Sequence, residues 1–335
     1  MACNSGCFND DTITPTPIPK DGTTTVRRIC FKCKATDALD SNNTDNCNVE
    51  AITNFCFDCF RANLYGKFKQ AVTAHDMISP TDNVLVAFSG GPASRVALQF
   101  VHEMQSKAQR NLDASRDKLY PVFGVGVAFV DESAVRFNPS HEEENTLQDM
   151  RLIMSTLAPP TKELHITPIE SIVSSESNDG RNKLKELLDI IVDVTGREDF
   201  LQHLRMLSLQ KISIDKGYTK LVVGSCTSRV ACHVISATVK GQGYSLPADI
   251  QHVDARWEIP VVLPLRDCLM QELAMLCRLD SLKTLDVSNG PHPGINGLVS
   301  SFISILQVRM LSFFYCSVPS QVPATQHMLP KTSVV

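Results

Sequence analysis

Two pairs of cysteines have the spacing of a metal site. Cys30 and Cys33 form one C-x-x-C pair, and Cys56 and Cys59 form a second pair after 22 intervening residues. Each pair can place two thiolates on one tight turn, and two such turns together form a tetrahedral zinc site. Four thiolates leave no open coordination position, so we expect structural zinc rather than a catalytic ion. Cys47 lies between the pairs and can replace one ligand.

The cysteines define a small module over residues 29–60, which follows a tail over residues 1–28. The tail is rich in Pro, Thr and Asp, and we expect it to be flexible. A module of this length buries too little apolar area to fold without its metal. Its core is expected to consist of the phenylalanines beside the cysteines, Phe31, Phe55, Phe57 and Phe60. The alternative is a set of unconnected thiols.

A glycine-rich turn is the second candidate site. Residues 84–88 form an apolar run typical of a buried strand, the turn Ser89-Gly90-Gly91-Pro92-Ala93-Ser94 follows, and a helical pattern comes next. In such a unit the glycines let backbone N–H groups face an anion, and the helix N-terminus adds its dipole. The sequence therefore predicts a phosphate cradle at the end of this strand.

Strand-like and helix-like segments alternate through the rest of the chain. Further strands are expected over 121–130, 163–168, 221–224 and 259–263. Helices are expected over 61–77, 142–157, 183–194, 199–215, 228–239 and 267–279, with a polar surface loop over 171–181. Strands that alternate with helices imply right-handed crossovers and a parallel sheet covered on both faces. The predicted fold is α/β, with a doubly wound parallel sheet.

Composition narrows the classes of function. A net charge of −4 and a pI near 6.1 argue against a stand-alone basic nucleic-acid binder, because phosphate neutralisation needs a local excess of Lys and Arg. The chain starts without the basic and apolar regions of a secretory signal, and no apolar run reaches the roughly 20 residues of a membrane span. We expect a cytoplasmic protein without membrane contact, whose twelve cysteines are thiols or metal ligands.

The glycine-rich turn and two later segments resemble the landmarks of the PP-loop ATP pyrophosphatases, which activate a substrate oxygen as its AMP adduct. Ser89, Gly90, Gly91 and Ser94 match the loop SGGxDS. Residues 204–229 resemble the second signature, an R-x-x-L helix that leads to a strand and GHNxDD. Residues 256–265 resemble the third, an arginine before a Pro-Leu strand. With the cysteine pairs, the resemblance points to the subgroup that thiolates tRNA, and it assigns residues 61–280 to a PP-loop domain.

The departures from these landmarks fall on the catalytic groups. The loop aspartate that would coordinate magnesium is replaced by Ala93, and the two aspartates of the second signature by Ser228 and Arg229. An arginine repels a metal ion at a position that needs a carboxylate. Active thiolation subunits also carry a cysteine pair before the R-x-x-L helix, whereas no cysteine lies between Cys59 and Cys226. The resemblance implies a degenerate domain with no catalytic residue and doubtful ATP binding.

A chain that keeps the landmarks but lacks the acids resembles the cytoplasmic tRNA 2-thiolation protein 2 family. This family is the degenerate sister of the catalytic thiolation subunit. The resemblance implies a heterodimer with that PP-loop sister, acting on tRNA. Its sulfur would come from a thiocarboxylated ubiquitin-related carrier, which the chain meets only indirectly. The product would be the 2-thiolated wobble uridine, 5-methoxycarbonylmethyl-2-thiouridine, in tRNA Lys, Glu and Gln.

Two alternatives stay open. The first is an active ATP-dependent adenylating tRNA sulfurtransferase with an unusual metal set, to which Asp82, Asp131 and Glu132 near strand ends contribute. The second is a nucleotide-binding scaffold of the same fold without a role in RNA. Trp257 can stack on a base, yet an aromatic residue just before a buried strand is more often part of the core.

The C-terminal part departs from the family pattern. Residues 281–335 are expected to form an incomplete C-terminal region, because the resemblance ends at Gln307 and the family's chains continue further. Val308-Arg309 can be encoded by GTAAGA, a sequence that begins introns, so residues 308–335 are interpreted as a splice-variant tail. A further cysteine pair of the family would then be missing, which leaves the competence of this form open.

Overall fold

The computed structural model describes residues 29–39, 54–115, 121–135, 142–174, 177–285 and 294–316. The predicted flexible tail, Cys47 and residues 317–335 lie outside the described residues.

A six-stranded sheet forms the centre of the molecule, in the order β3-β2-β1-β4-β6-β5. Neighbouring strands are parallel except β5 and β6, which are antiparallel. The strands are β1 Asn83–Ala87, β2 Gly124–Asp131, β3 Glu163–Pro168, β4 Lys220–Val223, β5 Val253–Asp254 and β6 Val261–Val262. The parallel-dominated sheet confirms the predicted α/β fold.

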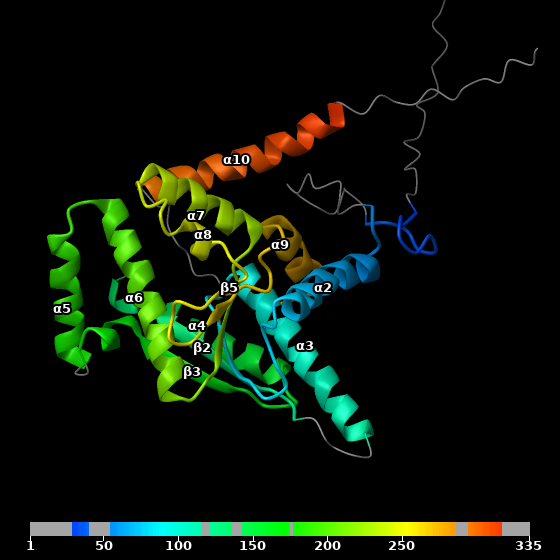
Figure 1. Cartoon of the computed structure of the whole chain (residues 1–335), viewed down its shortest axis with the longest axis horizontal. Helices are drawn as coiled ribbons and strands as arrows, with labels where there is room; N and C mark the ends of the chain where they lie inside the picture. Colours follow the sequence, from blue (N-terminus) through cyan, green and yellow to red (C-terminus); the bar gives the residue numbers. More distant parts are fainter. Residues whose placement is uncertain are drawn as a thin grey trace, which may run out of the picture.

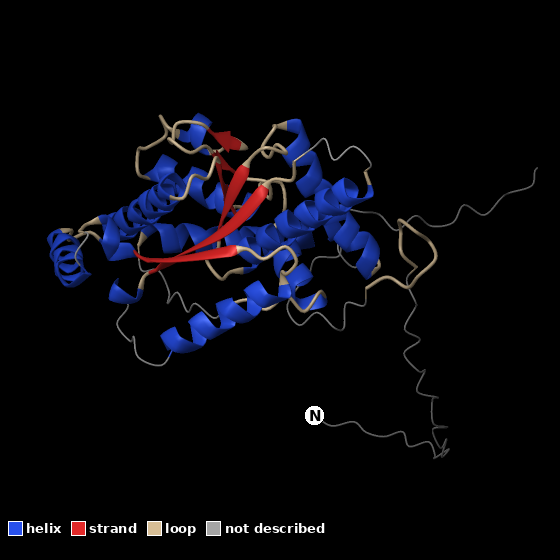
Figure 2. Cartoon of the chain, turned by 90° about the horizontal axis from the view of Figure 1, so that it is seen from below, coloured by secondary structure: helices blue, strands red, loops and turns tan. Residues whose placement is uncertain are grey.

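Helices cover both faces of this sheet (Figures 1 and 2). The main helices are α2 Phe57–Ala74, α3 Pro92–Ala114, α4 Glu142–Thr156, α5 Ser177–Ile190, α6 Val194–Asp215, α7 Thr227–Val239, α9 Met270–Leu279 and α10 Ile295–Cys316. Short turns are α8 Leu246–Asp249, η2 Ser133–Val135 and η3 Ile169–Ile172. In the part of the chain that the structure describes, none of the helices could span a membrane.

Alternate side chains of β1 separate two hydrophobic cores. Val84 and Val86 belong to the core that contains α2, α3, α4 and α9, whereas Leu85 belongs to the core formed with α5 and α6. This division follows from the two-residue period of a strand, which points successive side chains to opposite faces. All three residues are fully buried, as expected for a central strand of a doubly wound sheet.

Several predicted boundaries were wrong for local reasons. The polar segment 171–181 is not a loop throughout, because α5 already begins at Ser177. Helix α6 begins at Val194, five residues before the predicted start, because the Asp193 carboxylate accepts a hydrogen bond from Gly196 N at 2.6 Å and caps the helix. The predicted strand over 259–263 contains only Val261 and Val262, and the antiparallel β5 beside it was not predicted.

The strand order changes direction between β1 and β4, which creates a switch point at their carboxyl ends. From β1 the chain moves outward through β2 to β3, and it returns to the other side of β1 with β4. Open α/β sheets bind ligands at such a point. The glycine-rich turn after β1 and the second signature after β4 therefore lie side by side.

Gly224 makes this juxtaposition possible. A Cβ atom added to Gly224 would lie 2.6 Å from Ser94 N and 2.8 Å from Ala93 C, which are backbone atoms of the first turn of α3. These atoms cannot move without shifting the helix against the sheet. The close approach of β4 and α3 therefore requires glycine at this position.

We predict that Gly224→Ala lowers the free energy of unfolding by about 1–3 kcal/mol, the usual cost of overpacking a core. Gly66→Ala is the matched control, because Gly66 is exposed in α2 and its added Cβ would meet no atom within 4 Å. Alanine should stabilise that helix by up to about 1 kcal/mol. Urea denaturation followed by circular dichroism measures both changes, and equal effects would contradict the packing argument.

Candidate functional site

The four predicted metal ligands lie together. The Sγ atoms of Cys30, Cys33, Cys56 and Cys59 are all within 4.8 Å of one another. The distance between Cys33 Sγ and Cys56 Sγ is 3.8 Å. A tetrahedral ion with metal–sulfur bonds of about 2.3 Å spaces its ligands by about 3.8 Å, so the cluster has room for one metal ion.

Backbone hydrogen bonds shape the first cysteine turn. Lys34 N donates to Cys30 O at 2.9 Å, and Lys34 has a φ of +55°, which lets the chain reverse directly after Cys33. Phe31 N donates to Asn54 O at 2.8 Å, which joins this turn to the segment that carries the second pair. This hydrogen bond holds the two turns together through the main chain and does not use the Phe31 side chain.

The second pair lies at the start of α2. Cys56 is the N-cap residue of this helix and Cys59 lies in its first turn. Phe60, which follows, is 2% exposed and packs into the core of the α/β domain with Leu64 and Phe68. The metal-site segment and the domain therefore share one helix.

The prediction that Phe31, Phe55, Phe57 and Phe60 form a separate core of the cysteine module was wrong. Phe31 is 76% exposed and contributes no core contact. Phe55 and Phe57 are partly buried and pack, like Phe60, against the core of the α/β domain. The module is too thin for an interior of its own, so its aromatic residues join the larger core.

Without a bound cation, the pKa values of the cysteine thiols differ widely. A hydrogen bond from the Thr36 hydroxyl, 3.3 Å from Cys33 Sγ, lowers the pKa of Cys33 to about 6. Removal from water, together with hydrogen bonds to Cys56, raises the pKa of Cys59 to about 12. Four thiolates at this spacing repel one another, and a divalent cation at their centre removes that repulsion.

The glycine-rich turn has the backbone shape of a phosphate loop. Gly90 has a φ of +84°, Gly91 is the N-cap residue of α3, and Pro92 occupies the first position of that helix. The Ser94 hydroxyl donates to Gly91 O at 2.9 Å and accepts from Ser89 N at 3.2 Å. The structure brings Ser89 and the other predicted loop residues together, with their polar groups partly paired to one another.

The three positions that the resemblance assigns to acids carry Ala93, Ser228 and Arg229 and therefore no carboxylate. Ala93 is 4% exposed and its methyl group packs into the hydrophobic core. Ser228 is buried, and its Oγ accepts hydrogen bonds from Gln307 Nε2 at 2.7 Å and from Met270 N at 3.3 Å. Arg229, in the first turn of α7, is exposed. Neither Gln307 nor Met270 belongs to a motif, so the sequence offered no signal for these contacts.

The three carboxylates of the active-enzyme alternative have other partners. Asp82 precedes β1, about 17 Å along a five-residue strand from the glycine-rich turn. It accepts a hydrogen bond from Thr219 Oγ1 at 2.8 Å. Asp131 accepts from Ser133 N at 3.0 Å, and Glu132 forms an ion pair with Arg205 of the second signature.

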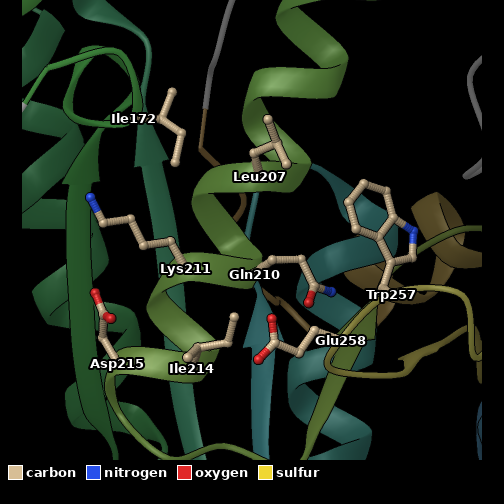
Figure 3. A pocket seen from close by; sticks show the side chains of 8 residues that line it. All are labelled: Ile172, Leu207, Gln210, Lys211, Ile214, Asp215, Trp257 and Glu258. Carbon is tan, nitrogen blue, oxygen red and sulfur yellow. The ribbon is translucent and has the colours of Figure 1, made fainter.

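The third landmark lies at the edge of the sheet formed by β5 and β6. Arg256 Nε donates to Asp254 Oδ1 at 2.8 Å, and this hydrogen bond lowers the pKa of the Asp254 carboxyl. Trp257 packs against the second core, as the core interpretation predicted. Its indole also forms one wall of an open groove of about 360 Å³ beside α6, opposite Ile172 (Figure 3).

Two signature segments that meet at the switch point of a mostly parallel sheet define a PP-loop type of α/β protein. The solved U34-tRNA thiolase NcsA from Methanococcus maripaludis, with its 4Fe-4S cluster, has the same fold at a TM-score of 0.58. The two chains are 16% identical, and the alignment covers 90% of this chain and 93% of that one. No family model matches the chain.

Sequence comparison shows the family. The chain is 49% identical to cytoplasmic tRNA 2-thiolation protein 2 of Arabidopsis thaliana over 99% of its length, and 57% identical to that of rice (Oryza sativa subsp. indica) over 86%. It spans 77% of the Arabidopsis protein and 61% of the rice protein. The human protein of this name is 23% identical. The chain belongs to the cytoplasmic tRNA 2-thiolation protein 2 family.

We predict that the purified chain contains one equivalent of bound metal and that Cys59→Ser reduces this content at least tenfold, because three thiolates bind more weakly than four. Cys232→Ser is the control, since this half-buried thiol of α7 does not belong to the cluster. Elemental analysis by mass spectrometry measures both. A metal-free wild type, or equal loss in both variants, would contradict the site.

Proposed function

We propose that the chain is the non-catalytic subunit of a heterodimeric cytoplasmic tRNA thiolation complex. The complex adds sulfur to the wobble uridine of tRNA Lys, Glu and Gln, giving 5-methoxycarbonylmethyl-2-thiouridine. Family membership supports the role in thiolation. The observation that carries the non-catalytic assignment is the set of groups at the acid positions, Ala93, Ser228 and Arg229.

These groups are poor ligands for the magnesium ion of a nucleotide. Mg²⁺ requires oxygen ligands, usually carboxylates, in near-octahedral geometry. The buried methyl group of Ala93 supplies none, and the Ser228 hydroxyl already accepts two hydrogen bonds. The cationic Arg229 repels the ion. A sheet that lacks these acids depends on a partner for adenylation.

The partner proposed is a catalytic PP-loop sister with its own acids. Two chains of one fold can pair about a pseudo-two-fold axis, because similar surfaces can meet in an isologous way. Such a dimer extends the surface available to tRNA, and the sister supplies basic groups that this chain, with a net charge of −4, lacks. The ubiquitin-related sulfur carrier then acts on the sister and meets this subunit only indirectly.

For the cysteine cluster we propose zinc. All four Sγ atoms lie within 4.8 Å, a spacing that suits one mononuclear ion, whereas the larger core of an iron–sulfur cluster holds its thiolates further apart. Zinc with four thiolates has no open position and no redox chemistry. Its role is to hold the first cysteine turn on the start of α2.

We predict that the chain alone does not convert ATP to AMP in the presence of tRNA, because its acid positions cannot position magnesium. Release of labelled AMP and pyrophosphate measures this activity. Turnover that persists through purification and disappears in Ser89→Ala would contradict the assignment and favour the active-enzyme alternative.

We predict that cells without this protein lose most of the 2-thio group from wobble uridines although the sister subunit is present. Nucleoside mass spectrometry of total tRNA measures the loss. Re-expression of the protein with Ala93 unchanged should restore the modification, and a form with Cys56→Ser and Cys59→Ser should not. Normal 2-thiouridine in the knockout would overturn the proposed function, and failure of tagged protein to copurify with tRNA or the sister would favour the scaffold alternative.

A further inference from the structure

The glycine-rich turn is partly covered by a later segment of the same chain. Leu285 follows α9, is 6% exposed, and packs in the core that includes α3. Its backbone N donates to Gly90 O at 3.0 Å. A Cβ atom added to Gly90 would lie 2.7 Å from Leu285 Cβ, so the leucine lies directly on the glycine.

A second contact closes the neighbouring part of the switch point. Gln307 of α10 donates from Nε2 to Ser228 Oγ at 2.7 Å, at one of the two acid positions after β4. Helix α10 runs alongside α7, which carries Ser228 (Figure 1). Leu285 and Gln307 both follow α9 in the chain. Leu285 contacts the glycine-rich turn, and Gln307 contacts the second signature segment.

We propose that the vestigial nucleotide site at the switch point has become a docking site for two residues of this chain. Leu285 covers the phosphate loop and Gln307 binds the Ser228 hydroxyl, and together they exclude phosphate and nucleotide. An anion in the loop needs several converging N–H donors and an open approach to Gly90. Here an apolar side chain lies on that glycine, and a charged group placed against it would lose hydration without compensation.

The contact with Leu285 also explains why position 90 is glycine. Its φ of +84° is a conformation that other residues adopt only with strain. A side chain there would also displace Leu285, and with it the backbone hydrogen bond to Gly90 O. The loop thus fixes the chain after α9, and Gln307 fixes α10 on α7, whether or not the protein acts in tRNA thiolation.

The test uses the full chain with its metal bound and inorganic pyrophosphate without magnesium, because that probe needs only backbone donors. Isothermal titration should detect no saturable binding to the wild type up to millimolar pyrophosphate. The double variant Leu285→Gly, Gln307→Ala should bind at least tenfold more tightly. Leu298→Ala should behave as wild type, because Leu298 is a 71% exposed leucine of α10.

Hydrogen exchange measured by mass spectrometry locates the effect. Amides of the peptide containing residues 89–94 should exchange at least tenfold faster in Leu285→Gly than in the wild type, and pyrophosphate should slow them again. Gln307→Ala, which removes one hydrogen bond, provides the second variant if Leu285→Gly does not fold, and it should also speed exchange around Ser228.

Wild-type binding of pyrophosphate at this peptide would overturn the proposal, as would open variants that bind no anion. Both measurements use the isolated chain, so they are independent of the thiolation test.

Discussion

The close approach of the end of β4 to the first turn of α3 is the constraint on which the rest of the structure depends. Gly224 lets the two backbones meet without a side chain between them. This contact holds the second signature beside the glycine-rich turn at the switch point of the sheet. Helix α9 contacts both α3 and α7, and its first residue, Met270, donates its backbone N–H to Ser228 Oγ.

Ion pairs join helices α2, α3 and α9 and so connect the switch point to the cysteine cluster at the start of α2. Arg61 of α2 forms ion pairs with Glu103 of α3 and, at 3.0 Å, with Asp280 just after α9. Lys67 of α2 pairs with Glu272 of α9 at 2.9 Å. These partly buried pairs connect three helices in a fixed arrangement, so the start of α2, where two of the four cysteines lie, is oriented by the α/β domain.

The glycine-rich turn has its loop conformation in a chain without carboxylates at positions 93, 228 and 229. The positive φ of Gly90 is set by local sterics, and Gly90 also packs against Leu285; neither depends on a carboxylate. Two of the three positions that the resemblance assigns to acids, 93 and 228, are buried as well. The methyl group of Ala93 packs in the hydrophobic core. The Ser228 hydroxyl accepts hydrogen bonds from Met270 and Gln307. The geometry of the turn therefore does not depend on carboxylates at these positions.

The sequence by itself determined the α/β class, the family, the strand that precedes the glycine-rich turn and the identity of the residues at the acid positions. These features are local: strand periodicity, C-x-x-C spacing and glycine-rich turns are readable from neighbouring residues. Only the tertiary structure decided that Phe31 is exposed, that Leu285 lies on Gly90, and that Gln307 reaches Ser228. Contacts between residues 79 or 195 positions apart in the chain leave no periodic pattern, because they depend on how whole helices pack rather than on which residues are adjacent.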